Sequence, residues 1–191
     1  MNKSIRWRII TLQSILVLVL AGASGFLFYE GSFVTGMVHD QLVAQKIYFP
    51  PQSQVTTGGA LDPAKFPSEI TQYAGQEVDN GDKAKVYAND FINVHLQSVA
   101  NGQTYAQVSS LAQADPTNTT LAGQVATLFK GETLRSMLLN AYGWWTIGVY
   151  TTYAGIGLMI AALAALAALV FELVVAGRKP ETVKVVQKTA A

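Results

Sequence analysis

The stretch SMLLNAYGWWTIGVYTTYAGIGLMIAALAALAALVF, residues 136–171, decides the fold, because none of its 36 positions carries a charge. A second uncharged run, IITLQSILVLVLAGASGFLFY, occupies residues 9–29 near the other end of the chain. A helix needs only about 20 apolar residues to cross a bilayer. The two runs therefore predict two transmembrane helices that enclose a polar central segment.

The second run is longer than a membrane requires, since 36 helical residues span about 54 Å against roughly 30 Å of hydrocarbon. We predict the first span at residues 9–29 and the second at 153–175, with residues 142–152 forming an outer interfacial segment of the same helix. Aromatic side chains settle at the boundary between hydrocarbon and headgroups. The predicted membrane-interface residues are Trp7, Trp144, Trp145, Tyr150 and Tyr153.

The positive charges predict the orientation of both spans. Cations flank the apolar runs on their outer ends, at Lys3, Arg6, Arg8, Arg178, Lys179, Lys184 and Lys188. Because positive flanks stay in the cytoplasm, we expect residues 1–8 and 176–191 to be cytoplasmic and residues 30–141 to form an extracytoplasmic domain. Glu172 then lies near the inner interface, with Arg178 as the expected partner. The central segment has six cations against ten acids, which argues against nucleic acid as a partner.

A cleavable signal peptide is the alternative interpretation of the first run. A basic start, an apolar stretch and Ala21-Gly22-Ala23 are typical of such a leader, and cleavage would leave a chain that begins at Ser24. Apolar helical character continues past this point, through residues 26–28 and 33–38, which favours an uncleaved span.

Small residues predict how the two spans pack. Ala21 and Gly25 in the first span, and Gly157, Ala161 and Ala165 in the second, recur at four-residue intervals. Small side chains at this spacing let helix backbones approach closely. We expect contact between the two spans of one chain, with self-association through the same faces as the alternative.

Helical periodicity dominates the central segment. The first span is expected to continue outward to about Ile47. Amphipathic helices are expected at residues 82–100 and 104–114. A further helix is expected to run from about Thr119 into the second span, with Gly131 as a candidate bend. Asp79 is the predicted N-cap of the helix at residues 82–100. The predicted fold is all-α, with two transmembrane helices continuous with an extracytoplasmic bundle of about four helices.

Residues 48–81 form a long irregular excursion from this bundle, rich in Pro and Gly, with one short helix expected at residues 67–74. A connection of this length is usually functional or mobile, and its aromatic residues favour an ordered segment that covers one face of the bundle. The predicted partner-contact residues are Tyr48, Phe49, Phe66 and Tyr73.

Few residues suggest chemistry. The chain has no cysteine, which excludes disulfides, thiolate catalysis and Cys-ligated metals. His39 and His95 lie on different predicted helices and are weak candidates for a metal site, which would need a third ligand such as Asp40 or Asp90. The acids around Asp79 and Asp82 do not match a calcium loop, and no nucleophile or phosphate-binding motif occurs. We therefore predict no cofactor and no enzymatic activity.

Three segments carry a family resemblance: HDQLVAQKIYFPP, AGQEVDNGDKAKVYANDFINVHL and LFKGETLRSMLLNAYGWW. Together they resemble an uncharacterised actinobacterial family of two-span membrane proteins, across most of residues 38–145. Members of that family sometimes carry a label as aromatic ring-opening dioxygenases, a label that implies an iron held by two histidines and a carboxylate. The resemblance implies the two-span architecture and a bacterial cell envelope, and it transfers no functional residue.

The sequence leaves two functional hypotheses. The first is a non-catalytic scaffold or accessory subunit in the bacterial cytoplasmic membrane, which contacts lipid and another envelope protein through its extracytoplasmic domain. The second is a ligand-sensing extracytoplasmic module. Because only about 15 residues follow the second span, a sensor of this kind needs a partner protein to carry its signal.

Overall fold

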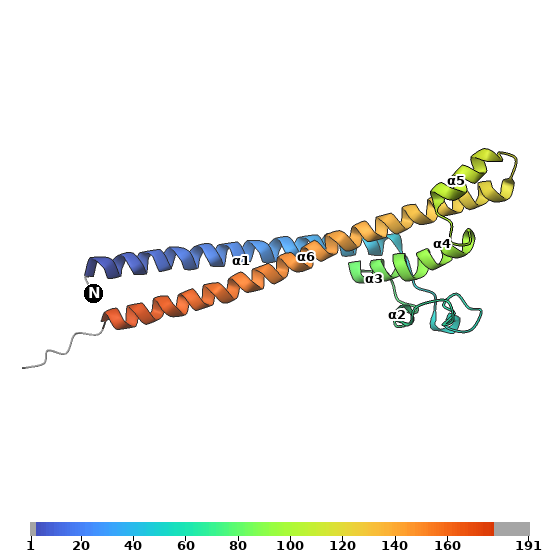
Figure 1. The fold of residues 1–191 in the computed structure, drawn as a ribbon. Helices are drawn as coiled ribbons and strands as arrows, with labels where there is room; N and C mark the ends of the chain where they lie inside the picture. Colours follow the sequence, from blue (N-terminus) through green and yellow to red (C-terminus); the bar gives the residue numbers. More distant parts are fainter. Residues whose placement is uncertain (1–2, 178–191) are drawn as a thin grey trace, which may run out of the picture. The chain divides into compact units, whose positions relative to one another are not determined.

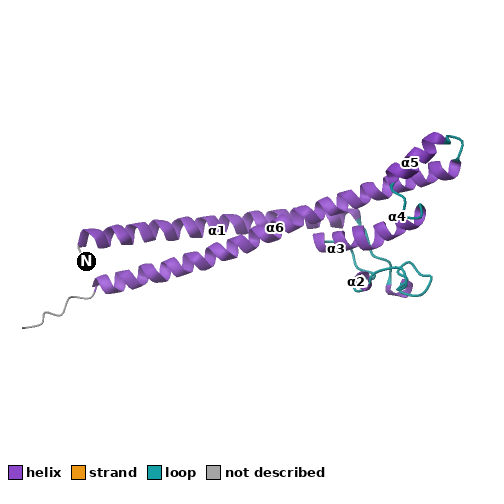
Figure 2. Cartoon of the chain, in the orientation of Figure 1, coloured by secondary structure: helices purple, strands orange, loops and turns teal. Residues whose placement is uncertain are grey.

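The computed structural model describes residues 3–177, and every helix or strand element in that range is helical (Figures 1 and 2). The two apolar runs lie in the long helices α1 (Lys3–Gln45) and α6 (Thr119–Gly177). The shorter elements are η1 (Gln52–Gln54), α2 (Ser68–Thr71), α3 (Gly81–Val86), the π-helix η2 (Tyr87–Ile92), α4 (Asn93–Val99) and α5 (Tyr105–Ala114). The predicted all-helical class with two long apolar helices is confirmed for the described residues.

Most of the predicted cytoplasmic tail, residues 176–191, lies outside the described residues, and so do Arg178, Lys179, Lys184 and Lys188. The described chain divides into two compact units. The terminal unit contains residues 3–28 and 153–177, and the central unit contains residues 29–152. These boundaries fall beside the predicted ends of the two spans, at residues 29 and 153.

In the terminal unit, α1 and α6 pack against each other in antiparallel directions. The buried Ser24 hydroxyl donates a hydrogen bond of 2.8 Å to the carbonyl oxygen of Gly155. Nearer the ends of the chain, the Arg6 guanidinium lies 3.7 Å from the carboxylate of Glu172. Among residues 3–177, Arg6 is the cation that the structure places beside Glu172, and the expected partner Arg178 lies outside the described residues.

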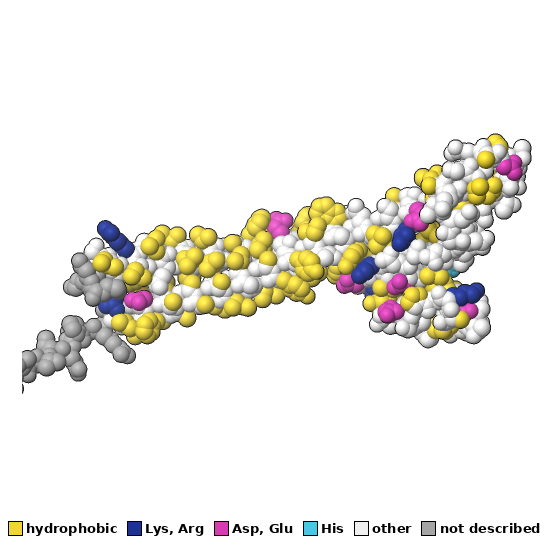
Figure 3. Space-filling view, viewed as in Figure 1, with side chains coloured by type: hydrophobic (Ala, Val, Ile, Leu, Met, Phe, Trp, Pro, Cys, Tyr) yellow, Lys and Arg dark blue, Asp and Glu magenta, His cyan; other side chains and the backbone are white. Residues whose placement is uncertain are grey.

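Both long helices are apolar and long enough to cross a membrane. Only 11% of the most apolar window of either helix is buried, which is unlike a core helix of a soluble protein. Hydrophobic side chains are distributed along the visible face of the terminal unit, with other side chains and backbone between them (Figure 3). The helix pair therefore presents apolar side chains outward as well as toward its partner helix.

The central unit has a hydrophobic core to which the excursion contributes directly. The buried core residues are Val38, Leu42, Phe49, Leu61, Phe66, Ile70, Val78, Ala84, Ala88 and Leu138. Five of these ten, from Phe49 to Val78, belong to residues 48–81. Backbone hydrogen bonds fix the ends of the segment, from the Phe49 amide to the Gln76 carbonyl oxygen and from the Val78 amide to the Ile47 carbonyl oxygen. The predicted excursion is thus an ordered part of the core.

Asp62 anchors the middle of this segment. Its buried carboxylate accepts hydrogen bonds from the backbone amides of Gly58, at 2.9 Å, and Ala64, at 3.0 Å. These two bonds hold the pKa of the Asp62 carboxyl below its ordinary value.

The run from α3 to α4 agrees in extent with the helix expected at residues 82–100, but it differs in two details. Asn80, and not Asp79, is the N-cap, since the Asn80 side chain accepts from the Lys83 amide at 3.0 Å, whereas the Asp79 carboxylate binds the Lys83 ammonium at 2.9 Å. The middle of the run is a π-helix. Helical periodicity in the sequence indicated one uniform helix here.

The helix α5 and the start of α6 agree with their expected limits, whereas α2 (Ser68–Thr71) is shorter than the helix expected at residues 67–74. A capping box between Thr104 and Gln107 begins α5, and the Asn118 side chain accepts from the Leu121 amide at the start of α6. Gly131 lies inside the uninterrupted α6, where a Cβ atom would clash with the Leu96 side chain. Close packing, and not a break in the helix, explains the glycine.

Candidate functional site

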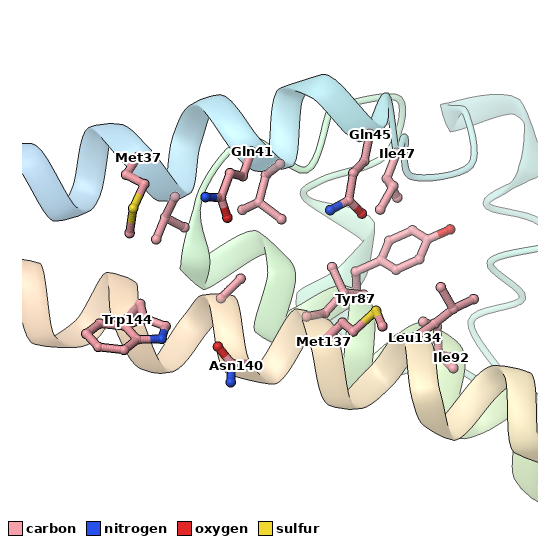
Figure 4. A pocket seen from close by; sticks show the side chains of 14 residues that line it. Met37, Gln41, Gln45, Ile47, Tyr87, Ile92, Leu134, Met137, Asn140 and Trp144 are labelled. Atoms are coloured by element: carbon pink, nitrogen blue, oxygen red, sulfur yellow. The ribbon is translucent and has the colours of Figure 1, made fainter.

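The central unit contains an apolar groove of about 430 Å³ between α1 and α6, floored in part by η2. Figure 4 shows Met37 and Trp144 at one end of the groove, and Ile47, Ile92 and Leu134 at the other. The buried core residues Val38, Leu42 and Leu138 also line it, so the groove lies directly on the hydrophobic core. Its volume lies in the range of small-molecule sites, roughly 300–1,000 Å³.

The groove has polar groups but no charged ones. None of its 14 lining residues is Asp, Glu, Lys, Arg or His. Polar groups come from the amides of Gln41, Gln45 and Asn140, with the Tyr87 phenol and the Trp144 indole. An apolar wall with a few amide and hydroxyl groups is the usual composition of a site for a neutral ligand.

The groove adjoins the π-helix η2 through two of its lining residues. Tyr87 begins the π-helix and Ile92 ends it, and both line the groove. π-helical turns are rare and occur frequently at functional sites. The Tyr87 ring packs edge-on against Phe49, with centroids 5.1 Å apart, and burial raises the pKa of its phenol. The phenol is therefore neutral at physiological pH and is able to donate a hydrogen bond.

The predicted partner-contact residues separate into buried and accessible ones. Phe49 and Phe66 are buried in the core, where Phe49 stacks on Tyr73 with centroids 5.5 Å apart. They are therefore inaccessible to a partner, because the core needs these rings for its own packing. Tyr73 is half-buried, and Tyr48 is exposed at 54%. Tyr48 remains the accessible member of the predicted set.

Four of the five predicted helix-packing residues do not lie between the two helices of the terminal unit. Ala21, Gly25, Gly157 and Ala161 are exposed, and a Cβ atom added to either glycine would meet nothing within 4 Å. Only Ala165 is half-buried.

The residues buried in the terminal unit are instead Ile10, Ser24, Gly155, Ala162 and Leu169. On α6 they recur every seven positions, and on α1 Ile10 and Ser24 are 14 positions apart. This spacing is that of left-handed helix pairs with a 3.5-residue repeat, whereas the prediction had used the four-residue spacing of right-handed pairs. The seven-residue spacing alone does not identify this face in the sequence, because the exposed residues Ala154, Ala161 and Ala168 recur at the same interval.

Four of the predicted interface aromatics are exposed, at 66% for Trp7, 50% for Trp144, 67% for Tyr150 and 62% for Tyr153. Trp145 is half-buried, and it packs so closely on Gly81 that any Cβ atom there would clash with the indole. Trp145 therefore joins α6 to the start of α3 in the central unit, which sequence alone did not indicate.

Each predicted metal-ligand histidine has another contact. His39 Nδ1 lies 2.8 Å from the carbonyl oxygen of Asp79, and His95 Nδ1 lies 2.9 Å from that of Phe91. Because carbonyl oxygens only accept, both Nδ1 atoms carry the proton and donate. The His95 ring also packs against Phe66 and Phe91. Within residues 3–177, no group of three or more potential ligands forms a metal site.

Comparison of the chain with protein-family models, with curated proteins and with solved structures found no match. Functional inference therefore depends on the chemistry of the groove and on the apolar helix pair.

Proposed function

We propose that this chain is a non-catalytic integral membrane protein of the bacterial cell envelope, with its central unit acting outside the cytoplasm as a scaffold or accessory subunit. The observation that carries the proposal is the outward-facing apolar surface of the terminal unit. Large side chains along both helices are exposed, including Leu18, Phe26 and Phe171 at 72%, 61% and 66%. A soluble protein rarely exposes a continuous apolar surface of this kind, whereas lipid is its natural solvent.

The contacts inside the terminal unit support a common side for both chain ends. The Arg6–Glu172 pair brings the start of α1 next to the end of α6. An antiparallel pair of spans returns the chain to the side from which it started. With the cations Lys3, Arg6 and Arg8 at this end, the positive-inside rule favours a cytoplasmic location for both ends and an extracytoplasmic central unit.

Three titratable side chains of the central unit, His39, His95 and Asp62, have structural roles. Both histidines donate to backbone carbonyls, and the Asp62 carboxylate accepts two backbone amides. These contacts support a binding role for the unit. Tyr48 is the first candidate for a protein contact, because it is a large exposed aromatic on an ordered segment.

Topology is testable with introduced cysteines, because the chain has none of its own. In intact cells, a membrane-impermeant maleimide should label Gln97→Cys in α4, whereas Ser4→Cys should react only after the membrane is permeabilised. Extraction of the protein by detergent, but not by alkaline carbonate, completes the test. Labelling of Ser4→Cys from outside, or recovery of a mature chain beginning at Ser24, contradicts the two-span proposal.

The accessory role requires a stoichiometric partner that depends on the central unit. Purification in mild detergent should retain a partner with the wild-type chain, and Tyr48→Ala should weaken its retention without lowering the melting temperature. Thr57→Ala, at an exposed position in the same segment, is the matched control. A chain that purifies alone as a monomer after crosslinking in native membranes argues against a scaffold.

Ligand sensing through a partner is a second candidate function, and the groove is the observation that favours it. Because α1, α6 and η2 line the groove, a ligand bound there contacts both long helices and is expected to shift their conformational equilibrium. Thermal stabilisation of the purified chain by a small molecule, without any partner present, distinguishes this function from the first.

A further inference from the structure

The groove of the central unit combines an apolar floor, amide groups on α1 and the absence of charge among its lining residues. We propose that it binds an uncharged long-chain lipid taken from the outer leaflet of the membrane, with the chain against Leu138 and Trp144 and the uncharged headgroup at Gln41 and Gln45. This inference rests on the proposed membrane location, and it adds a ligand site to it.

The lining determines the charge of the ligand. A charged headgroup brought against this wall would lose the part of its hydration that the apolar lining displaces, without gaining an oppositely charged partner, which disfavours both phospholipid anions and cationic amphiphiles. A hydroxyl or ester headgroup has a much smaller desolvation cost, and amide side chains satisfy it with hydrogen bonds in both directions.

The polar groups are placed for a single headgroup. Gln41 and Gln45 are four residues apart on α1 and therefore lie on one face of the helix, and Figure 4 shows both side chains extending toward α6. Both side chains are exposed, so a headgroup can reach them while its chain contacts the apolar lining. Leu138 is buried beneath, and the flexible side chains of Met37 and Met137 adapt to chains of different shape.

The position of the groove along the central unit favours the membrane as the source of the lipid ligand. Exposed aromatic rings at Tyr29 and Tyr150 mark the expected headgroup boundary on the two long helices. Met37 follows Tyr29 by eight residues and Trp144 precedes Tyr150 by six, which are helical distances of about 12 Å and 9 Å. The groove thus begins within one lipid length of that boundary, as an outer-leaflet ligand requires.

Photoaffinity labelling of the full-length protein in phosphatidylcholine nanodiscs tests the inference. Three probes share one diazirine-bearing C16 chain and differ in headgroup: a monoacylglycerol, a fatty-acid carboxylate and an alkylamine. Peptide mass spectrometry locates the label. We expect the monoacylglycerol to label the Met37–Ile47 and Leu134–Trp144 segments about tenfold more than either charged probe does.

Two variants sharpen the test. Gln41→Lys places an ammonium at the headgroup position and should shift the preference of the groove to the carboxylate probe, whereas Gln97→Lys on the exposed face of α4 should leave it unchanged. Ala141→Phe should fill the groove and remove labelling by every probe. Gln41 is exposed, so its variant is expected to fold even where Ala141→Phe does not.

Each failure has a distinct meaning. Equal labelling by the three probes, or labelling of residues 153–175 without the groove, overturns the lipid site and leaves the membrane proposal intact. Crosslinks between the groove and a second copy of the chain overturn the lipid site in favour of self-association. If neither the groove nor the two apolar segments react and the chain remains in the aqueous phase, the membrane proposal fails as well.

Discussion

Two glycines on α1 of the central unit provide the sharpest test of its helix packing. A Cβ atom on Gly31 would clash with the Thr152 hydroxyl and lie 2.8 Å from the Gly148 carbonyl oxygen and 2.9 Å from the Thr152 amide nitrogen. A Cβ atom on Gly36 would meet nothing within 4 Å. Both positions are helical, so replacement by alanine reduces the backbone entropy lost on folding by the same amount at each.

The expected effects of the two substitutions have opposite signs. At Gly36 only helix propensity acts, and alanine should stabilise by about 1 kcal/mol. At Gly31 the same gain is opposed by overpacking of about 3 kcal/mol, the upper end of the usual range because backbone atoms of α6 must move. The net loss is about 2 kcal/mol, since the two contributions partly cancel.

Thermal unfolding of the purified protein in one detergent measures both effects. For a chain of this size, Gly36→Ala should raise the melting temperature by about 2–4 °C and Gly31→Ala should lower it by about 4–8 °C. A Gly31→Ala protein as stable as Gly36→Ala would refute the close approach of α1 and α6 at this point.

Four further outcomes are expected. Gly25→Ala and Gly157→Ala, at the predicted but exposed packing positions, should leave stability unchanged or slightly raised, and a loss at both would restore the four-residue register. Arg6→Glu and Glu172→Arg should each destabilise the protein, while the double variant recovers part of the loss, with a coupling energy of about 1 kcal/mol in a double-mutant cycle of unfolding. The pKa of Asp62 is lowered in the folded state by two backbone amides, so its contribution to stability is present at neutral pH and is lost as the pH falls below about 4. Asp62→Asn should lower the melting temperature at pH 7, and the melting temperature of this variant should fall less on acidification than that of the wild type. The pKa of Asp90 is raised, first by burial and then by the charge of Glu69, so Asp90→Asn should raise the melting temperature at pH 7.

Much of the fold follows from local sequence signals. The uncharged runs and the helical periodicity specify α1, α5 and α6 closely, because each begins or ends at a strong local signal such as the Thr104 capping box or the Asp115-Pro116 break. The role of residues 48–81 did not follow. Whether Phe49 and Phe66 point outward or inward depends on the surfaces that α1 and η2 present to them, and those surfaces exist only in the folded chain.

Neither the π-helix nor the groove could be predicted from the sequence, and the reason is similar for both. Ala84 and Ala88 fit an ordinary helical repeat, and both are buried, so the pattern gives no sign of the wider turn that follows Val86. The groove likewise depends on a gap between side chains of α1 and α6, and a pattern of apolar residues predicts a buried face without predicting where it is incompletely filled.

The register of the helix pair follows from the hydrogen bond of Ser24. A serine hydroxyl inside an apolar pair needs an acceptor, and the carbonyl oxygen of Gly155 accepts its hydrogen bond at a point where glycine lets the two helices approach. Once Ser24 faces Gly155, a 3.5-residue repeat brings Ala162 and Leu169 to the same face and turns Gly157 and Ala161 outward. Misalignment by a single position would remove this hydrogen bond between the helices, and the Ser24 hydroxyl would be left with a carbonyl of its own helix, as the Ser14 hydroxyl bonds the Ile10 carbonyl oxygen at 2.8 Å. A hydrogen bond across the interface can thus favour one register, which a stripe of small residues does not specify by itself.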